Sequence, residues 1–242
     1  MRAMPQRFDP TDWPRPTTVL VLAPHPDDFD AIGVTLRALA AHGHALHLAV
    51  LTPGSSGVDD GFQGALDDDA KAALREQEQL ASCRFFGLPA ARCHFLRLWQ
   101  RADRAVDDAE RLRTLVRQLQ PGLVFMPHGN DSNATHRRSY EAFHALAQAE
   151  RLTLQACLNQ DAKTQGLRPD RVMPFGEAEA AWKAQLLRHH ESQQQRNQRS
   201  RGHGFDARVV QVNRDAAAGL GLAEPYAEVF ELARYVDGRV QT

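Results

Sequence analysis

Short apolar runs alternate along the first two thirds of the chain with longer segments whose apolar residues recur every three or four positions. The short runs predict buried strands over 18–23, 45–52, 93–98 and 123–126. The longer segments predict helices over 33–42, 70–86, 106–119 and 139–149. Strands that alternate with helices of this length are typical of right-handed βαβ units. We therefore expect an α/β protein with a Rossmann-like, three-layer fold and a mostly parallel sheet.

The two ends of the chain are less regular. Residues 1–16 mix charged residues with prolines, which predicts an extended leader without the apolar segment of a signal peptide. In the last third the pattern predicts a helix over 178–190 and a strand over 227–235. The stretch 193–204 is rich in Gln and Arg without interleaved aromatic residues, so we expect a mobile, solvated loop there. The whole chain, 1–242, is expected to form a single domain with a less regular C-terminal portion.

Composition narrows the class of partner. The chain has 242 residues, and its 29 Lys and Arg residues nearly balance its 30 Asp and Glu residues. No overall field therefore favours nucleic acid or a membrane surface, and a small molecule is the expected partner. The three cysteines have no paired spacing, and no apolar stretch approaches the length needed to span a bilayer. These features predict a cytoplasmic protein.

A polar cluster follows the first predicted strand at once. Residues 24–30 read Pro-His-Pro-Asp-Asp-Phe-Asp, with His25 and the adjacent Asp27 and Asp28. One imidazole and two carboxylates in a single turn are the ligand types that a divalent transition metal uses. A turn of this kind can also simply cap a helix, so the cluster gains weight only if another part of the chain supplies a further ligand.

A second polar cluster, 127–136, follows the strand predicted over 123–126 and ends in His136. The carboxyl ends of parallel strands share one edge of a sheet, so both clusters are expected to line that edge, with the Gly- and Asp-rich stretch 55–69 beside them. His25, Asp28 and His136 then make a three-ligand site with one position open to water, which is typical of catalytic zinc. Asp27 remains free to take a proton from that water, as amide hydrolysis requires. The alternative for His136 is an ordinary histidine at a helix start.

These residues resemble the PIG-L/LmbE-type family of zinc-dependent N-acetylglucosaminyl deacetylases. Residues 24–30 look like its first motif, Ala-His-Pro-Asp-Asp-Glu, and 131–136 look like its second, Asp-x-His-x-Asp-His. Weaker similarities occur around 52–54, 75–87, 183–193 and 226–230. The resemblance implies that His25, Asp28 and His136 bind Zn²⁺, or another divalent transition metal, and that Asp27 is the general base.

The chain departs from the second motif at two positions. Asn133 stands where many members carry a histidine that assists the oxyanion or a protonation step, and Thr135 replaces an aspartate. An amide cannot titrate, but it can donate a hydrogen bond to a developing oxyanion. We therefore expect Asn133 to be a catalytic residue that polarises the substrate. Asp27, once protonated, could then deliver the proton to the leaving amine.

Three further residues have two interpretations each. Asp30 could support a metal ligand from behind or cap a helix. Asp131 could orient a ligand histidine or close a turn. Arg75 could extend over the edge of the sheet and hold a substrate hydroxyl or anionic group, or it could form a solvated ion pair with a neighbouring Glu. Arg75 and Asp131 are candidate substrate-binding residues.

Together these observations predict a zinc-dependent hydrolase that removes an N-acyl group, in the first place acetyl, from a sugar-like small molecule. One alternative is an amidase that acts on another amide, such as a thiol conjugate. Another is a non-catalytic member of the fold that binds metal or sugar, which the absent motif histidine favours. The sequence leaves homo-oligomer formation open.

Overall fold

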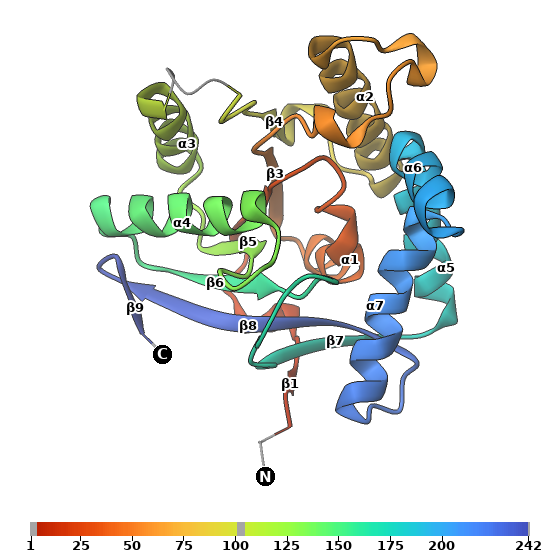
Figure 1. Ribbon diagram of the computed structural model, residues 1–242. Helices are drawn as coiled ribbons and strands as arrows, with labels where there is room; N and C mark the ends of the chain where they lie inside the picture. Colours follow the sequence, from red (N-terminus) through yellow and green to blue (C-terminus); the bar gives the residue numbers. More distant parts are fainter. Residues whose placement is uncertain (1–3, 101–104, 242) are drawn as a thin grey trace.

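A mixed β-sheet forms the centre of the computed structural model, which describes residues 4–100 and 105–241 (Figure 1). The strand order is β1-β7-β8-β6-β5-β2-β3-β4, and β9 pairs with β8. The strands are β1 Gln6–Arg7, β2 Thr18–Ala23, β3 Ala45–Val50, β4 Cys93–Phe95, β5 Leu123–Pro127, β6 Leu154–Asn159, β7 Arg171–Phe175, β8 Tyr226–Val236 and β9 Arg239–Gln241.

The sheet is mostly parallel, as the alternating pattern predicts. Strands β4, β3, β2, β5 and β6 run parallel to one another, and β1 runs parallel to β7. The long strand β8 is antiparallel to β6, β7 and β9. The four strands predicted in the first two thirds of the chain all occur, with small differences at their ends.

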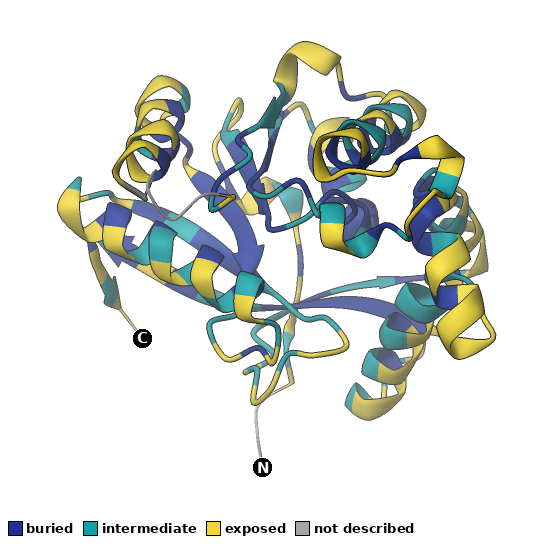
Figure 2. Cartoon of the chain, turned by 45° about the horizontal axis from the view of Figure 1, so that its top comes forward, coloured by how far each residue is buried: buried dark blue, intermediate teal, exposed yellow. Residues whose placement is uncertain are grey.

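Helices cover both faces of the sheet. Apolar side chains of α3 and α4 pack on one face, and those of α1 and α2 pack on the other, which confirms the three layers (Figures 1 and 2). No helix in the described ranges has both the length and the apolar composition for crossing a bilayer. The helices are α1 Gly33–Ala41, α2 Asp68–Phe86, α3 Ala105–Leu119, α4 Ala134–Ala149, α5 Glu177–Arg188, α6 Glu191–Arg201 and α7 Phe205–Leu220.

The described part of the leader, residues 4–16, is largely extended and packs on the core. Strand β1 pairs with β7, and the side chains of Phe8 and Trp13 are buried against the face of the sheet that α1 and α2 cover. The Trp13 indole Nε1 also donates a hydrogen bond to Gln155 Oε1 over 3.2 Å. The leader is therefore part of the folded unit.

The prediction of a mobile loop over 193–204 is wrong, because most of this stretch lies in α6. Gln and Arg are good helix formers, and Gly202 ends the helix in the left-handed region that glycine favours. The buried face of α6 is polar, with Ser192, Gln193 and Asn197 against the rest of the protein. Because the buried residues of α6 are polar, the helix has no apolar residues at helical spacing. The sequence pattern therefore did not reveal it.

The sheet brings the two polar clusters together. The registers pair Val21 of β2 with Phe125 of β5, and Phe125 with Cys157 of β6. All three strands are parallel, so the segments that follow them lie at one edge of the sheet. That edge carries residues 24–30, 128–136 and 160–164.

A buried ion pair anchors the C-terminal section to α1. Glu228 on β8 lies 2.7 Å from Lys183 Nζ, and the two side chains are 1% and 0% exposed. The Glu228 carboxylate also accepts hydrogen bonds from the backbone N–H groups of Val34 and Thr35, over 3.0 and 2.8 Å. Burial lowers the pKa of Lys183, and Glu228 opposes that shift.

Replacing Glu228 with Ala is expected to destabilise the fold by about 3–5 kcal/mol, because it leaves a buried ammonium without its partner. Denaturant unfolding of the two proteins measures the difference. Glu224→Ala is the control, since Glu224 pairs with the exposed Arg7 at the surface and its loss should have a much smaller effect. Equal unfolding midpoints for Glu228→Ala and the parent protein would contradict the role of this pair.

Candidate active site

The first cluster turns sharply at the end of β2. The backbone N–H of His25 donates to Asp28 Oδ2 over 2.8 Å, and His25 Nδ1 lies 3.4 Å from the same oxygen. The two side chains are 24% and 23% exposed, so both reach the solvent-accessible edge of the sheet. The turn therefore holds an imidazole and a carboxylate side by side.

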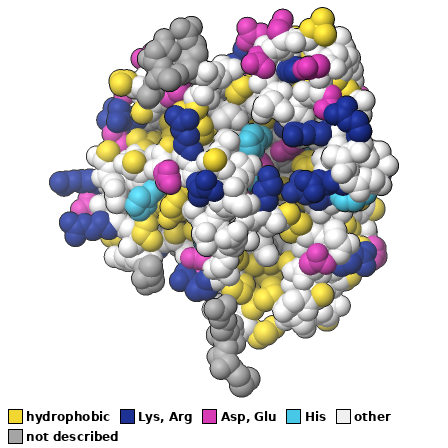
Figure 3. Space-filling view, viewed as in Figure 1, with side chains coloured by type: hydrophobic (Ala, Val, Ile, Leu, Met, Phe, Trp, Pro, Cys, Tyr) yellow, Lys and Arg dark blue, Asp and Glu magenta, His cyan; other side chains and the backbone are white. Residues whose placement is uncertain are grey.

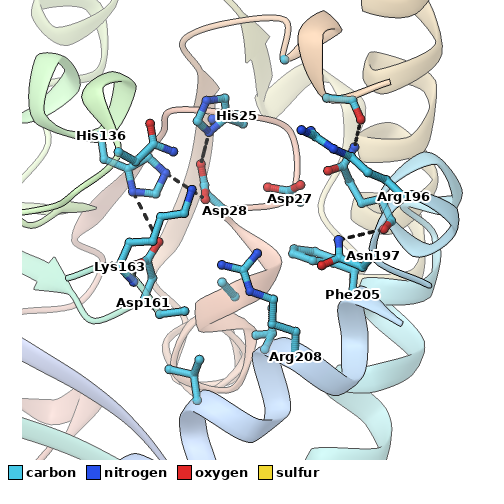
Figure 4. A pocket seen from close by; sticks show the side chains of 18 of the residues that line it. His25, Asp27, Asp28, His136, Asp161, Lys163, Arg196, Asn197, Phe205 and Arg208 are labelled. Atoms are coloured by element: carbon cyan, nitrogen blue, oxygen red, sulfur yellow. Dashed lines mark hydrogen bonds and ion pairs between the residues drawn. The ribbon is translucent and has the colours of Figure 1, made fainter. Parts of the chain in front are cut away.

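His136 joins this pair from the first turn of α4. Its Nε2 lies 3.7 Å from Asp28 Oδ1, and its ring centroid is 5.4 Å from that of His25. One donor atom from each of His25, Asp28 and His136 lies within 4.8 Å of the others (Figure 4). The three residues named from the sequence are thus close enough to hold one ion, and their role as ligands remains a proposal.

Two carboxylates hold the far nitrogen of His136. Its Nδ1 lies 3.1 Å from Asp131 Oδ2 and 3.4 Å from Asp161 Oδ2. This arrangement directs Nε2 toward Asp28, as outer carboxylates do for metal-binding histidines. Asp131 also accepts the backbone N–H of Asn133 over 2.6 Å, so it both orients the histidine and closes a turn. Its side chain has no exposed surface, which argues against the direct substrate contact expected of it.

Sequence reasoning missed Asp161. This residue follows β6, a strand that the pattern did not reveal, and it reaches the same edge as the two recognised clusters. The available signal was the polar sequence Asn159-Gln160-Asp161 after the mainly apolar stretch 154–158.

The charges of this group are strongly coupled. Burial acts to lower the pKa of His136, but its three carboxylate neighbours outweigh that effect and raise the pKa to about 9. Burial acts to raise the pKa of Asp28, but His136 and His25 outweigh it, so the pKa lies below its ordinary value. Burial raises the pKa of Asp161 despite the attraction of His136. The site thus favours positive charge at its centre, which a proton or a cation can supply.

Asp27 lies beside the three-residue group in a strained backbone conformation. Its φ of 119° is in the region that favours glycine, which costs on the order of 1–3 kcal/mol for other residues. Its backbone N–H donates to Gln79 Oε1, and its Oδ2 accepts from Arg75 Nη2, both over 2.9 Å. Contacts from α2 therefore fix the direction of this carboxylate.

Arg75 is buried, so the alternative of a solvated ion pair with a neighbouring Glu is wrong. Its side chain is 2% exposed and pairs with Asp27, while the same nitrogen donates to the carbonyl of Pro26. Its Nε and Nη1 are buried without a hydrogen-bond partner in the described ranges. Gly54, with a φ of 64°, lies against this guanidinium and Pro26: a Cβ there would lie 3.4 Å from Arg75 Nε and 3.2 Å from Pro26 Cδ. A substrate contact by Arg75 remains a prediction.

Asp30 forms no helix cap and is completely buried. It accepts hydrogen bonds from Ser82 and from Gln79 Nε2, the latter over 3.2 Å, and lies 2.6 Å from His190 Nε2. Because Gln79 also holds the backbone of Asp27, Asp30 supports the turn from behind. The structure thus favours the supporting role over the cap.

Asn133 is the N-cap of α4. Its Oδ1 accepts the backbone N–H of Thr135 over 3.0 Å, which orients the side-chain amide. Asn133 also lines the cavity in front of the three-residue group. Its NH₂ group is therefore the end that can donate to a substrate.

A cavity of about 530 Å³ opens over these residues (Figure 4). Its walls come from the turn after β2, the start of α4, the segment after β6, and helices α6 and α7. The Gly- and Asp-rich stretch expected at this edge contributes Ser56 and Gly57. Figure 3 shows Lys and Arg side chains gathered around a hollow in which histidine is visible.

Solved structures share this fold. N,N′-diacetylchitobiose deacetylase from Pyrococcus horikoshii is 19% identical with a TM-score of 0.73, covering 93% of this chain and 85% of that one. GalB, the 4-carboxy-2-hydroxymuconate hydratase from Pseudomonas putida, is 20% identical with a TM-score of 0.70, covering 89% and 95%. Teicoplanin deacetylase Orf2 is 14% identical with a TM-score of 0.65, covering 90% and 98%.

The sequence comparisons extend this likeness. A putative glucosamine-6-phosphate deaminase-like protein from Bacteroides thetaiotaomicron is 26% identical in an alignment of 194 positions that covers 57% of this chain and only 28% of that protein's length. The sequence model of the PIG-L family, described as GlcNAc-PI de-N-acetylase, matches residues 20–147, which include both polar clusters. The chain belongs to the PIG-L family.

Proposed function

We propose that this protein is a metal-dependent hydrolase that removes an N-acyl group, in the first place acetyl, from an amino-sugar-like small molecule. The observation that carries the proposal is the placement of His25, Asp28 and His136 around one point, with the Asp27 carboxylate beside them at the cavity wall. Family membership supports it, and the fold alone would not, because one neighbour of the same fold is a hydratase.

The donor set fits a catalytic metal. Two imidazole nitrogens and one carboxylate oxygen within 4.8 Å of one another suit zinc, and three protein ligands leave room for water or substrate. When bound there, the ion would lower the pKa of water and polarise the substrate carbonyl. Asp131 and Asp161 would keep the Nε2 atom of His136 directed at it.

The chain's own residues account for the proton transfers. Asp27 takes a proton from the attacking water, whose oxygen forms a bond to the acyl carbon. The Asn133 amide donates a hydrogen bond to the developing oxyanion, and such donors typically contribute about 10²–10³ in rate. Asp27 then returns the proton to the nitrogen as the C–N bond breaks, which yields a carboxylic acid and an amine. Arg75 holds Asp27 in the required direction throughout.

The test is amine release from a panel of N-acetyl amino sugars and thiol conjugates. The zinc-loaded protein should release amine from one or more of the sugars, lose activity on chelation and regain it when zinc is restored. Release from the thiol conjugates alone would favour the amidase alternative. Binding of sugars without release from any compound would favour the non-catalytic alternative and reject the proposal.

A further inference from the structure

Four cationic side chains line the cavity besides Arg75. Lys163 follows β6, Arg196 and Arg201 belong to α6, and Arg208 belongs to α7. In Figure 4, Arg208 extends toward Asp27 and Asp28, while Lys163 runs along the side of His136. Three separate segments thus direct positive charge at one space.

None of these four cations has a carboxylate within ion-pair distance in residues 4–100 and 105–241. Neighbouring arginines on the same part of the fold do have one: Arg188 lies 2.7 Å from Asp206, and Arg199 lies 2.7 Å from Asp59. Lys163, Arg196 and Arg201 are exposed, whereas Arg208 is half-buried. A cation that has lost part of its hydration is costly unless an anion compensates it.

Arg208 shows this cost most clearly. It is half-buried, and both burial and the nearby Arg201 lower its pKa. Arg196 packs close to the backbone of Gly57: a Cβ there would lie 3.3 Å from Arg196 Nη1. The guanidinium groups therefore stand close to the space in which a substrate would lie.

The carboxylates that line the cavity already interact with cationic or histidine side chains. Among the residues that the structure describes, the carboxylates that line it are Asp27, Asp28 and Asp161, against five Lys and Arg residues, although the chain as a whole has a net charge of −1. Asp27 is paired with Arg75, and Asp28 and Asp161 face His136. Any bound metal would add to the positive excess. The cavity is therefore a local positive field that attracts anions.

We propose that the cavity binds an N-acyl amino sugar carrying a phosphate or carboxylate group remote from the amide, and that Arg208 and Arg196 bind this anion with help from Lys163 and Arg201. The position of the amide rests on the proposed function, whereas the anion site rests on the cations alone. The volume is in the range of sites for whole small molecules, so there is space for more than the acyl group.

The test compares matched substrates: N-acetylglucosamine, its 6-phosphate, and N-acetylmuramic acid as the carboxylate arm. The zinc-loaded protein should hydrolyse at least one anionic compound with a kcat/KM about 10- to 100-fold above that of the neutral sugar, the range expected for a charge-assisted hydrogen bond. Arg208→Gln and Arg196→Gln should each remove most of that preference, so that the ratio of kcat/KM for the anionic sugar to that for the neutral sugar falls toward one. Added salt should also reduce the preference.

Arg199→Gln is the matched control, because Arg199 lies on the same helix as Arg196, pairs with Asp59 and does not line the cavity. It should keep the full preference. Equal kcat/KM for neutral and anionic sugars in the parent protein would overturn the anion site while leaving the proposed function intact. Loss of preference in Arg199→Gln equal to that in Arg208→Gln would also overturn it.

Calorimetry can measure the affinity of the amine products, and this measurement tests the anion site separately from the proposed hydrolase function. Glucosamine, glucosamine 6-phosphate and muramic acid undergo no amide hydrolysis, so the comparison holds even if no substrate turns over. An anionic product should bind about 10-fold or more tightly than glucosamine, and Arg208→Gln should abolish the difference. Equal affinities, or displacement of the anionic product by a short oligonucleotide at equal concentration, would reject the assignment to small anions.

Discussion

Replacing Asp27 with Asn is expected to lower kcat/KM for amide hydrolysis by about 10²–10⁴-fold, the range that general-base groups contribute. The substitution keeps the shape of the side chain and leaves an oxygen that can accept from Arg75, but an amide cannot take a proton from water. Metal content should stay unchanged, because Asp27 is not in the three-residue group. Steady-state amine release and metal analysis on the same preparation measure the two quantities.

Asp60→Asn is the control for this substitution. Asp60 pairs with Lys71 on the surface, and its side chain is 87% exposed. It should keep full activity. Unchanged turnover in Asp27→Asn would reject Asp27 as the base, and loss of metal together with activity would make Asp27 a ligand instead.

Replacing His136 with Ala, or His25 with Ala, is expected to remove the metal. Loss of even an outer partner of a metal ligand typically costs 10- to 100-fold in metal affinity, so loss of a ligand should weaken binding by more than about 100-fold. Metal per chain should then fall to near zero after dialysis, and amine release should disappear with it. Elemental analysis and competition with a chelator of known affinity measure the change.

His128→Ala provides a matched histidine control. His128 precedes His136 in the same segment, but it lies 3.4 Å from Glu231 and does not line the cavity. Metal content and activity should therefore remain. Full metal retention in both His25→Ala and His136→Ala would show that other residues bind the ion.

The parts of this site that the sequence predicts are those that follow strongly apolar strands. The runs that became β2 and β5 contain no interrupting polar residue, so the clusters after them could be placed at one edge of the sheet. β6 contains Gln155, a polar residue that is accommodated by Trp13 from the leader. That long-range contact cannot be recognised from the sequence around Gln155. The strand was therefore not predicted, and neither was Asp161.

Arg75 and the C-terminal helices were harder to predict for a similar reason. The sequence neighbours of Arg75 include glutamates, but Glu78 accepts hydrogen bonds from Ser192 and Glu76 pairs with Arg97. The partner of Arg75 lies 48 positions away in the chain. Local spacing cannot distinguish a solvated arginine from one whose ion pair forms only when α2 packs against the turn after β2.

The two sides of the cavity come from different lengths of chain. His25, Asp27, Asp28 and His136 all lie within residues 20–147, which the family model matches, whereas the cations of the opposite wall follow residue 147. The residues proposed to carry out the reaction and those proposed to select the substrate could therefore change independently in evolution. A relative could acquire a new specificity by altering α6 and α7. Exchanging residues 191–220 between members would transfer the proposed anion site while leaving Asp161 and the proposed metal ligands in place.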